Sequence, residues 1–317
     1  MKLLDHLDVT PSSFLNKDVL TWLDFTQEDI SKLLARAQQL KEHPHSSILN
    51  GKTLAMLFEK SSTRTRVSFE VGMTQLGGHA INLHPRDLQL GRGETIADTA
   101  NVLSGYVDAI MYRSSSHHKL KELAQHSRVP VINGLCDTFH PCQALADLFT
   151  VLELKGKLSN VKIVYLGDGN NVSHSLMVCA ALMGLDIVVS TPKGFEPDPN
   201  ITEKAKHLAQ TSNGSVAIDH NPERAAEGAD IVYTDVWKSM GQEEDHTRYS
   251  KLQPYQANEA LMKSAKPDAH FMHCLPAHRG EEVTAGVIDG PKSVVFQQAE
   301  NRLHVQKAML QSIIPTS

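Results

Sequence analysis

The chain has 317 residues, of which 41% are hydrophobic and 21% charged, enough apolar sequence for two domains of about 150 residues each. Its formal net charge of -5 gives no basic footprint for a nucleic acid, and no apolar run approaches the ~18 residues of a membrane span. The acidic N-terminal stretch lacks the apolar core of a signal peptide, so we expect a cytosolic protein. The four cysteines form no C-x-x-C pair, which argues against a disulfide framework or a structural zinc site.

The first half of the chain alternates apolar strands with amphipathic helices. The pattern predicts strands over 52–58, 79–84, 107–113 and 129–135 and helices near 65–77, 94–106 and 117–127. This βαβ rhythm is typical of a parallel sheet with helices on both faces. A further helix over 140–156, ending at Gly156, is expected to link the two halves.

The second half repeats the rhythm. It predicts strands near 161–167, 185–191, 215–219, 229–236, 269–275 and 293–296, and a closing helix over 297–314. We therefore expect two doubly wound α/β domains, one over 1–150, completed by the C-terminal helix (297–317), and one over 151–296. Because ligands bind beyond the carboxyl ends of strands in open parallel sheets, we expect the site in a cleft between them.

The junction at residues 58–70 combines hydroxyl and guanidinium groups at the start of a helix. Ser62, Thr63, Arg64 and Thr65 follow an apolar strand. A helix N-terminus offers unpaired N–H groups and the positive end of the helix dipole, and arginine binds phosphate oxygens bidentately. The run predicts a phosphate cradle. The alternative is a simple helix cap followed by a solvated basic face.

A second group of polar residues follows the third and fourth strands. Arg113 ends a strand, and His140 and Gln143 stand three residues apart on the first turn of the linking helix. Converging on one oxygen, these three donors would form an oxyanion site. Taken singly, each has a structural explanation as a surface charge, a helix cap or an exposed helix residue.

Two strand ends in the second half carry further candidates. Gly167 and Gly169 start a dinucleotide-like pattern, but the third glycine expected at position 172 is Val172. A nucleotide-binding regulator or an NAD-dependent dehydrogenase is the alternative on that pattern. Asp235, followed by Ser239, ends another strand and offers acceptors for an ammonium group, or otherwise an Asx-type turn.

Six strings of this sequence resemble motifs of the aspartate/ornithine carbamoyltransferases, in the family's order and over nearly the whole chain: SSTRTR-x-SFE, MYR, HPCQ, D-x-W-x-S-M-G, HCLP and AENR. The resemblance implies a two-domain fold with the last helix crossing back to the first domain, and a homotrimer or a multiple of it. It implies no cofactor and no metal. It implies carbamoyl phosphate binding by Ser62, Thr63, Arg64, Thr65, Gln89, Arg113, His140, Gln143, Cys274, Leu275 and Arg302, with Gln89 contributed to a neighbouring subunit's site.

Within the family, the D-x-W-x-S-M-G and HCLP strings resemble those of the ornithine-specific members. The resemblance then implies that Asn171 and the Met240 backbone bind the α-carboxylate of ornithine, that Asp235 and Ser239 bind its α-amino group, and that Cys274 lies near its δ-amine. The implied reaction is carbamoyl transfer to that amine, giving L-citrulline and phosphate in arginine metabolism, with Thr65, Arg113, His140 and Cys274 as catalytic residues. Putrescine and an N-acylated ornithine are the alternative amines, against which the intact S-M-G motif argues. The polar stretch over 242–250 is expected to be a loop that closes over the substrate.

Overall fold

The structure, a computed structural model, describes residues 14–84, 86, 88, 93–237 and 246–316. The chain divides into two compact units, unit 1 from the residues up to Phe149 with those from Asn301 onward, and unit 2 from Thr150–Glu300. Three predicted site residues, Gln89, Ser239 and Met240, lie outside the described residues.

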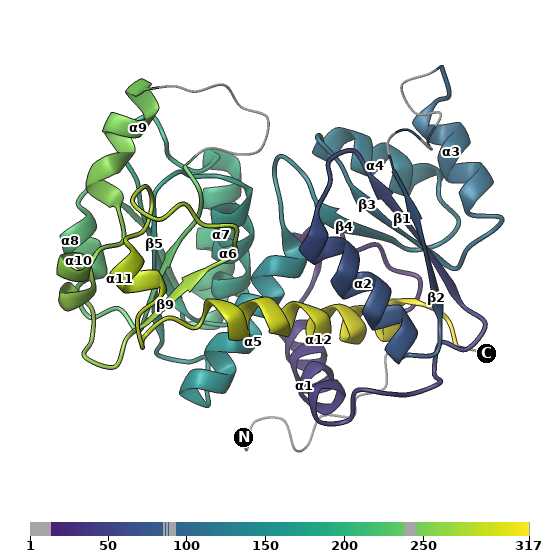
Figure 1. Ribbon diagram of the computed structural model, residues 1–317, viewed down its shortest axis with the longest axis horizontal. Coiled ribbons are helices and arrows are strands. Elements are labelled where there is room, and N and C mark those ends of the chain that lie inside the picture. Colours follow the sequence, from purple (N-terminus) through teal and green to yellow (C-terminus); the bar gives the residue numbers. More distant parts are fainter. Residues whose placement is uncertain (1–13, 85, 87, 89–92, 238–245, 317) are drawn as a thin grey trace. The chain divides into compact units, whose positions relative to one another are not determined.

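Unit 1 contains a four-stranded parallel sheet with the strand order β2-β1-β3-β4 (Figure 1). Its strands are β1 (Thr53–Phe58), β2 (His79–Leu83), β3 (Ala109–Arg113) and β4 (Val131–Leu135). All four strands predicted for the first half are confirmed; β1, β3 and β4 are short and largely buried apolar runs, while the edge strand β2 is partly exposed.

The helices of unit 1 follow the predicted alternation, with two additions before the first strand, η1 and α1. They are η1 (Trp22–Asp24), α1 (Gln27–Glu42), α2 (Thr63–Gln75), α3 (Ile96–Leu103) and α4 (His117–His126), together with the parts of α5 (Pro141–Lys155) and α12 (Val295–Ile313) that lie in this unit. The periodicity analysis missed α1, although a capping box marks its start: Thr26 and Asp29 bond each other's backbone N–H groups.

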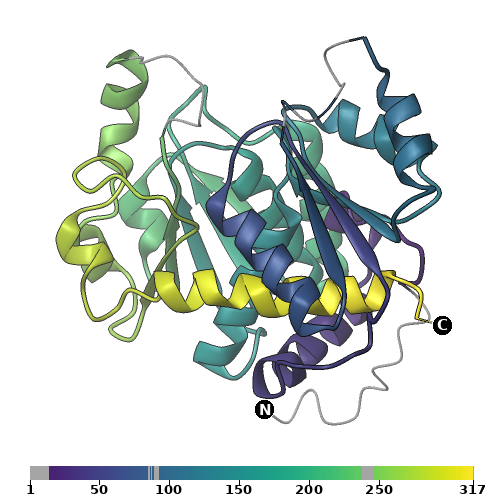
Figure 2. The same cartoon turned by 45° about the vertical axis from the view of Figure 1, so that its right-hand side comes forward.

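The core of unit 1 lies between the sheet and its helices. On one face, Ala55, Leu57, Ile110 and Tyr112 pack with apolar residues of α3 and α4. The alternate residues of β1 are also fully buried, as expected of a strand covered on both faces. The α2 and α12 helices approach closely at Gly72, where an added Cβ atom would lie 3.4 Å from the Lys307 side chain. Figure 2 shows these two helices on the same side of the sheet.

A buried lysine ties α12 to the rest of unit 1. Lys307 is fully buried, and its Nζ donates to the Leu40 carbonyl (2.9 Å), the Pro44 carbonyl (3.1 Å) and Gln75 Oε1 (2.8 Å). Burial lowers the pKa of Lys307 to about 8. The three acceptors come from the end of α1, the segment after it and α2, so one side chain joins three distant parts of the chain.

Unit 2 contains a five-stranded parallel sheet with the order β7-β6-β5-β8-β9. Its strands are β5 (Lys162–Leu166), β6 (Asp186–Ser190), β7 (Ser215–Asp219), β8 (Ile231–Thr234) and β9 (His270–His273). Its remaining helices are α6 (Asn171–Leu182), α7 (Pro199–Ser212), α8 (Pro222–Ala226), α9 (His246–Leu252), η2 (Gln253–Tyr255), α10 (Glu259–Ser264) and α11 (Ala285–Ile288). Val164, Val232 and Phe271 pack on one face against apolar residues of α8, α10 and α11.

Two predictions for unit 2 were wrong. Residues 293–296 are not a strand: Ser293 makes a single bridge to Phe271, and the chain enters α12 at Val295. Val295 is buried in the core, but the next residue, Phe296, is 75% exposed. This pattern fits the start of a helix and not a strand buried on both faces. The predicted loop over 242–250 includes the first part of α9, a polar helix whose pattern gives no apolar periodicity.

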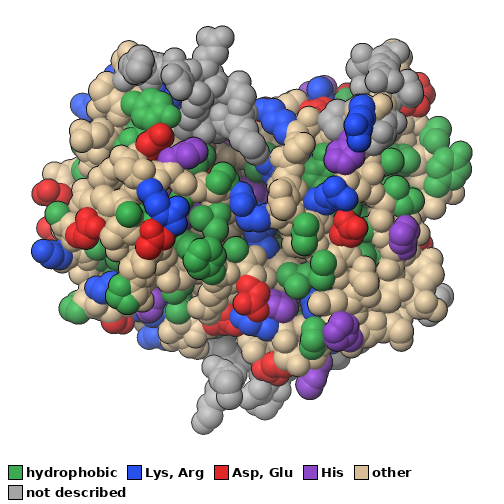
Figure 3. All heavy atoms as spheres, viewed as in Figure 1, with side chains coloured by type: hydrophobic (Ala, Val, Ile, Leu, Met, Phe, Trp, Pro, Cys, Tyr) green, Lys and Arg blue, Asp and Glu red, His purple; other side chains and the backbone are tan. Residues whose placement is uncertain are grey.

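The molecular surface carries mixed charge. On the face shown in Figure 3, basic and acidic side chains are interspersed over each unit. No helix of the described part of the chain combines the length and apolarity of a membrane span.

Candidate active site

The predicted phosphate cradle lies where β1 leads into α2. Ser62 is the N-cap of α2, and its Oγ accepts a hydrogen bond from the Thr65 backbone N–H at 3.3 Å. Thr63 is the first helical residue and is exposed, while Arg64 is half-buried. The predicted strand, turn and helix are therefore present, and the free N–H groups of the first turn give this end a positive potential.

The Thr65 hydroxyl is the centre of a buried cluster in unit 1. Its Oγ1 accepts from Ser62 Oγ at 3.0 Å, from Arg302 Nη2 at 3.0 Å and from Arg113 Nη1 at 3.4 Å. Thr65 is fully buried, and both arginines are more than nine-tenths buried. Arg302 lies two turns into α12, in the same unit as Thr65. Residues about 50 and 240 positions away thus meet at one hydroxyl.

His140 precedes α5 directly and is buried. Burial, together with the positive charges of Arg302, Arg113 and Arg64, holds the pKa of His140 well below its usual range. The imidazole is therefore neutral near pH 7, with one N–H donor and one acceptor nitrogen. A neutral imidazole can donate a hydrogen bond to a carbonyl oxygen, but it carries no proton to give up as an acid.

His140 should make the protein more sensitive to acid. Because the pKa is lowered in the folded chain, only the unfolded chain takes up this proton near pH 6, and stability falls as the pH drops below the unfolded value. The wild-type free energy of unfolding should lose up to about 2 kcal/mol more than that of His140→Gln between pH 7 and pH 5. Urea titrations at both pH values measure the difference, with His207→Gln at an exposed position as the control. An equal pH dependence in wild type and His140→Gln would contradict the assignment.

Gln143 does not point its amide donor at the cluster as expected. Its Nε2 donates to Asp147 Oδ1 at 2.8 Å, one helical turn further along α5, and both side chains are buried. Among the described residues, Gln143 Oε1 has no hydrogen-bond partner. Gln143 therefore offers an acceptor to a ligand, and one of the two N–H donors of its amide is committed to Asp147. The sequence signal was present in the i, i+4 spacing of Gln143 and Asp147.

Glu59, which was not among the predicted site residues, is hydrogen-bonded to the segment that follows Arg113. It lies between β1 and the cradle, and it accepts hydrogen bonds from the Tyr112 hydroxyl (2.5 Å), the Ser115 N–H (2.6 Å) and Lys119 Nζ (2.9 Å). Burial opposes ionisation, but hydrogen bonds from Ser115, Tyr112 and Lys119 prevail and lower the pKa of Glu59 to about 2. The anionic carboxylate thereby fixes the segment that follows Arg113.

Three strand ends of unit 2 converge on Asp235. Asn170, Asp235 and Cys274 follow β5, β8 and β9, which are neighbours in the sheet. Asp235 Oδ2 accepts from Asn170 Nδ2 at 2.8 Å, and Asp235 Oδ1 accepts from Cys274 Sγ at 3.0 Å. The Asp235 side chain is 7% exposed. The carboxyl ends of adjacent parallel strands thus bring a carboxylate, an amide and a thiol into one cluster.

The glycine-rich loop after β5 is built for packing and not for a dinucleotide. An added Cβ atom at Gly169 would lie 2.2 Å from the Pro197 nitrogen, so the segment 195–197 occupies the space beside it. Asn170 Oδ1 caps α6 by accepting from Val172 N (3.0 Å) and Ser173 N (3.1 Å). Asn171 is the first residue of α6 and is half-buried. Asn170, which was not among the predicted site residues, is the neighbour that bonds Asp235.

Arg248 on α9 connects that helix to the same loop. Its guanidinium pairs with Asp168 and also donates from Nε to the Trp237 carbonyl at 2.5 Å. Burial raises the pKa of Asp168, and the charge of Arg248 works against that rise. The pairing holds α9 against the loop that carries Asn170. No local spacing predicts this pair, because the partners are 80 residues apart.

Two residues outside the HCLP motif, Gln298 and Glu282, form hydrogen bonds with its first residue, His273. The His273 backbone N–H donates to Gln298 Oε1 at 2.9 Å, and the Leu275 N–H donates to His273 Nδ1 at 2.9 Å. Because Nδ1 is an acceptor, the ring proton of a neutral His273 lies on Nε2. This N–H donates a hydrogen bond to Glu282 Oε1 at 3.1 Å. Leu275, at φ 57°, is half-buried.

Comparison with known proteins places these clusters in a family context. The family model described as "Aspartate/ornithine carbamoyltransferase, carbamoyl-P binding domain" matches residues 17–153, and "Aspartate/ornithine carbamoyltransferase, Asp/Orn binding domain" matches residues 159–313. The ornithine carbamoyltransferase of Bacillus subtilis is 60% identical over 307 residues, 96% of each chain. The anabolic ornithine carbamoyltransferase of Pyrococcus furiosus is 56% identical over 304 residues, 94% of this chain and 96% of its own. A solved structure of ornithine carbamoyltransferase from Pyrococcus furiosus aligns with a TM-score of 0.93 at 55% identity, covering 95% of this chain and 98% of its own.

The chain has two parallel α/β units, each with a polar cluster beyond its strand ends. The two carbamoyltransferase family models together match residues of both units. The chain belongs to the aspartate/ornithine carbamoyltransferase family. The relatives described above all carry the name ornithine carbamoyltransferase.

Proposed function

We propose that this chain is an enzyme that transfers the carbamoyl group of carbamoyl phosphate to the δ-amine of L-ornithine, giving L-citrulline and phosphate. The observation that carries the proposal is the identity of 60% to an ornithine carbamoyltransferase over 96% of the chain. Two features of the chain support it independently: the cationic cluster around Thr65 in unit 1 and the acidic cluster around Asp235 in unit 2. Arginine synthesis is the proposed role, since one close relative is named anabolic.

We assign carbamoyl phosphate to the unit 1 cluster. The first turn of α2 and Arg64 bind the phosphate, because N–H groups and a guanidinium suit its charge. Arg113, Arg302, Thr65 and His140 surround the carbonyl oxygen as buried donors. Gln143 Oε1 accepts from the carbamoyl NH₂, since its own amide nitrogen is committed to Asp147. We also propose that Gln89, Cys274 and Leu275 contact carbamoyl phosphate, as the motifs predict.

We assign L-ornithine to the unit 2 cluster. Asp235 accepts from the α-amino group, and Asn171 donates to the α-carboxylate. The predicted partners Ser239 and Met240 complete this end of the substrate. Cys274 donates a hydrogen bond from Sγ to Asp235 Oδ1 at 3.0 Å, and we assign to it the orientation of the δ-amine. The sequence-based prediction of a cleft between the domains stays a prediction.

The reaction follows from these charges. The neutral δ-amine attacks the carbonyl carbon, a C–N bond forms, and negative charge develops on the oxygen, where two buried guanidinium groups stabilise it. The C–O bond to phosphate then breaks, and the departing phosphate accepts a proton from the nitrogen. His140 takes part as a neutral hydrogen-bond donor, because its lowered pKa leaves it without an acidic proton.

A citrulline assay with a panel of amines tests the proposed function. We expect product with L-ornithine, dependent on carbamoyl phosphate, and little turnover with putrescine or with an N-acylated ornithine. Rapid turnover of either of these amines in preference to ornithine would overturn the substrate assignment. The absence of carbamoyl transfer to any amine would overturn the function.

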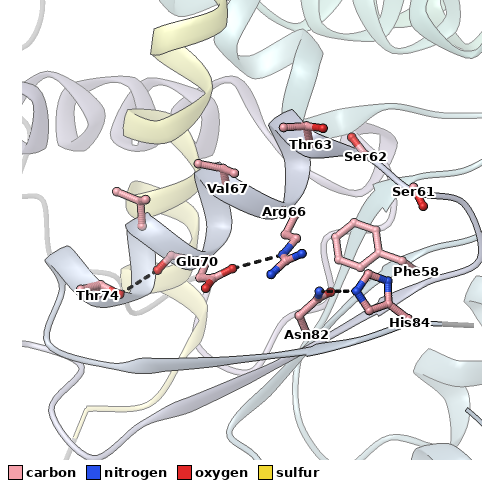
Figure 4. A pocket seen from close by; sticks show the side chains of 11 residues that line it. Phe58, Ser61, Ser62, Thr63, Arg66, Val67, Glu70, Thr74, Asn82 and His84 are labelled. Atoms are coloured by element: carbon pink, nitrogen blue, oxygen red, sulfur yellow. Dashed lines mark hydrogen bonds and ion pairs between the residues drawn. The ribbon is translucent and has the colours of Figure 1, made fainter. Parts of the chain in front are cut away.

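We also propose that the enzyme is a homotrimer, or a multiple of it, with active sites shared between subunits. A pocket of about 640 Å³ on unit 1 lies between α2 and β2 and is lined by both apolar and polar residues (Figure 4). Val67 and Val71, which line it on α2, are 50% and 36% exposed. Exposed aliphatic residues gathered beside one pocket support contact with a second copy. Arg66 and Glu70 pair at 3.4 Å beside them.

Val67→Glu should break this assembly, because a carboxylate would be buried without a partner in an apolar contact. We expect wild type to elute at three times the 34.9 kDa chain mass, or a multiple of it, and the variant at the mass of one chain. Light scattering after gel filtration measures both. Val102→Glu, at a residue 48% exposed on α3, is the control and should leave the mass unchanged. A wild-type protein of single-chain mass would refute the proposal.

The cytoplasm is the proposed location. All four cysteines are free thiols, as is usual for proteins of a reducing compartment. Burial raises the pKa of Cys142 to about 12, so this thiol is inert at neutral pH.

A further inference from the structure

A second cluster of potential ligand atoms lies in unit 2, between β9 and α11. His278, Glu281 and Glu282 each offer one atom, and these atoms all lie within 4.8 Å of one another. None of the three residues has a role in the proposed carbamoyl transfer. The turn that carries them is fixed by backbone hydrogen bonds, from Gly280 N to the Val283 carbonyl at 2.8 Å and from Glu281 N to the His278 carbonyl at 3.0 Å.

Glu282 is the residue that most needs an additional partner. Its side chain is fully buried. Oε1 accepts from the His278 backbone N–H at 2.6 Å and lies 3.1 Å from His273 Nε2, whereas Oε2 has no hydrogen-bond partner in the described part of the chain. Glu281 Oε2 is likewise shielded from solvent and without a hydrogen bond to any described residue. Buried carboxylate oxygens are costly unless they are hydrogen-bonded or bind a cation.

The geometry around these oxygens suits a metal ion. His278 Nδ1 lies 3.8 Å from Glu281 Oε2 and 3.8 Å from Glu282 Oε2. These separations are too long for hydrogen bonds. Ligand atoms at about 2.1 Å from a tetrahedral zinc ion lie about 3.4 Å apart, which small side-chain rotations would reach. The His278 side chain is 49% exposed, so an ion can enter from solvent.

We propose that His278, Glu281 and Glu282 bind a divalent transition-metal ion, with zinc as the best match to one imidazole and two carboxylate ligands. His273 supports the site, because its Nε2–H holds Glu282 Oε1 and leaves Oε2 for the ion. The site is independent of the proposed reaction.

Another group of ligand types, Asp235, His273 and Cys274, is a poorer candidate. Both oxygens of Asp235 already accept hydrogen bonds, from Asn170 and Cys274, and His273 Nδ1 accepts one from Leu275 N–H. A metal ion there would have to displace these bonds. The oxygens of the proposed site lose no hydrogen bond on binding.

Calorimetric titration of the untagged full-length chain with Zn²⁺ tests the proposal. We perform it in a Cys274→Ser background, so that binding to that thiol does not contribute. One zinc ion per chain should bind, and Glu281→Gln and His278→Ala, each added to this background, should weaken it by at least about 100-fold. Glu223→Gln and His207→Ala, at exposed positions on α8 and α7, are the matched controls and should bind as the background does.

Co²⁺ gives a second measurement that does not depend on stoichiometry. Its visible absorption in the Cys274→Ser background should show tetrahedral nitrogen and oxygen ligation, and it should disappear in the Glu281→Gln and His278→Ala variants. Because both side chains are partly exposed, these variants should fold, which circular dichroism checks. Absence of binding, binding lost on Cys274→Ser alone, or equal affinity in the Glu281→Gln and His278→Ala variants would each overturn the proposal.

Discussion

Replacing Arg64 with alanine should lower kcat/KM for carbamoyl phosphate by about 10²- to 10³-fold while the chain remains folded. Arg64 is half-buried in the first turn of α2. After burial and the charges of Arg302 and Arg113, its positive charge also lowers the pKa of His140. Its guanidinium adds to the positive potential of the helix end. Removing it leaves the strand, the turn and the Ser62 cap in place.

Steady-state kinetics with carbamoyl phosphate varied at saturating ornithine measure this effect. Arg224→Ala is the matched control, since it removes an exposed guanidinium that pairs with Asp219 in unit 2. Thermal unfolding should be similar for the two variants. Near-wild-type kcat/KM in Arg64→Ala would show that the phosphate is bound elsewhere and would remove the cradle from the proposal.

Asp235→Asn should lower kcat/KM for ornithine by about 10³-fold and reduce the preference for ornithine over putrescine. The buried carboxylate is the acceptor proposed for the α-amino group, and charge-assisted hydrogen bonds are about twice as strong as neutral ones. Wild type should favour ornithine by ~10⁴-fold, because an amine without the α-amino and α-carboxylate groups leaves buried polar groups unpaired. The loss in the variant should come from weaker use of ornithine and not from better use of putrescine.

The comparison requires kcat/KM for both amines on both proteins. Asp268→Asn, which removes an exposed carboxylate paired with Lys155, is the control and should leave both values unchanged. If the wild-type protein used putrescine and ornithine equally well, the ornithine assignment would fail while the carbamoyl phosphate assignment stood. An unchanged ornithine value in Asp235→Asn would remove only the role of Asp235.

The fold was predictable wherever local pattern and burial agree. Of the ten predicted strands the structure confirms nine: the inner strands carry continuous apolar runs because both of their faces are covered, while the edge strands β2 and β7 are only partly buried. The run at 293–296 misled the prediction, since apolar residues at a helix start and in a short strand look alike without knowledge of the neighbours. The polar α9 helix was missed because it has no apolar periodicity, whereas α1 was missed although Ile30, Leu33, Leu34, Ala37 and Leu40 recur at helical spacing.

For the candidate site, the sequence by itself determined where the candidate residues lie along the chain, because short motifs place polar side chains at strand ends and helix starts. Ser62 at the start of α2 and Asp235 after β8 lie where the pattern predicted. Only the tertiary structure decided what each side chain contacts. It brings Arg302 to the Thr65 hydroxyl, turns the Gln143 amide towards Asp147, and selects Asn170 as the partner of Asp235. Hydrogen bonds between residues far apart in the chain depend on the packing of whole elements, which no local spacing records.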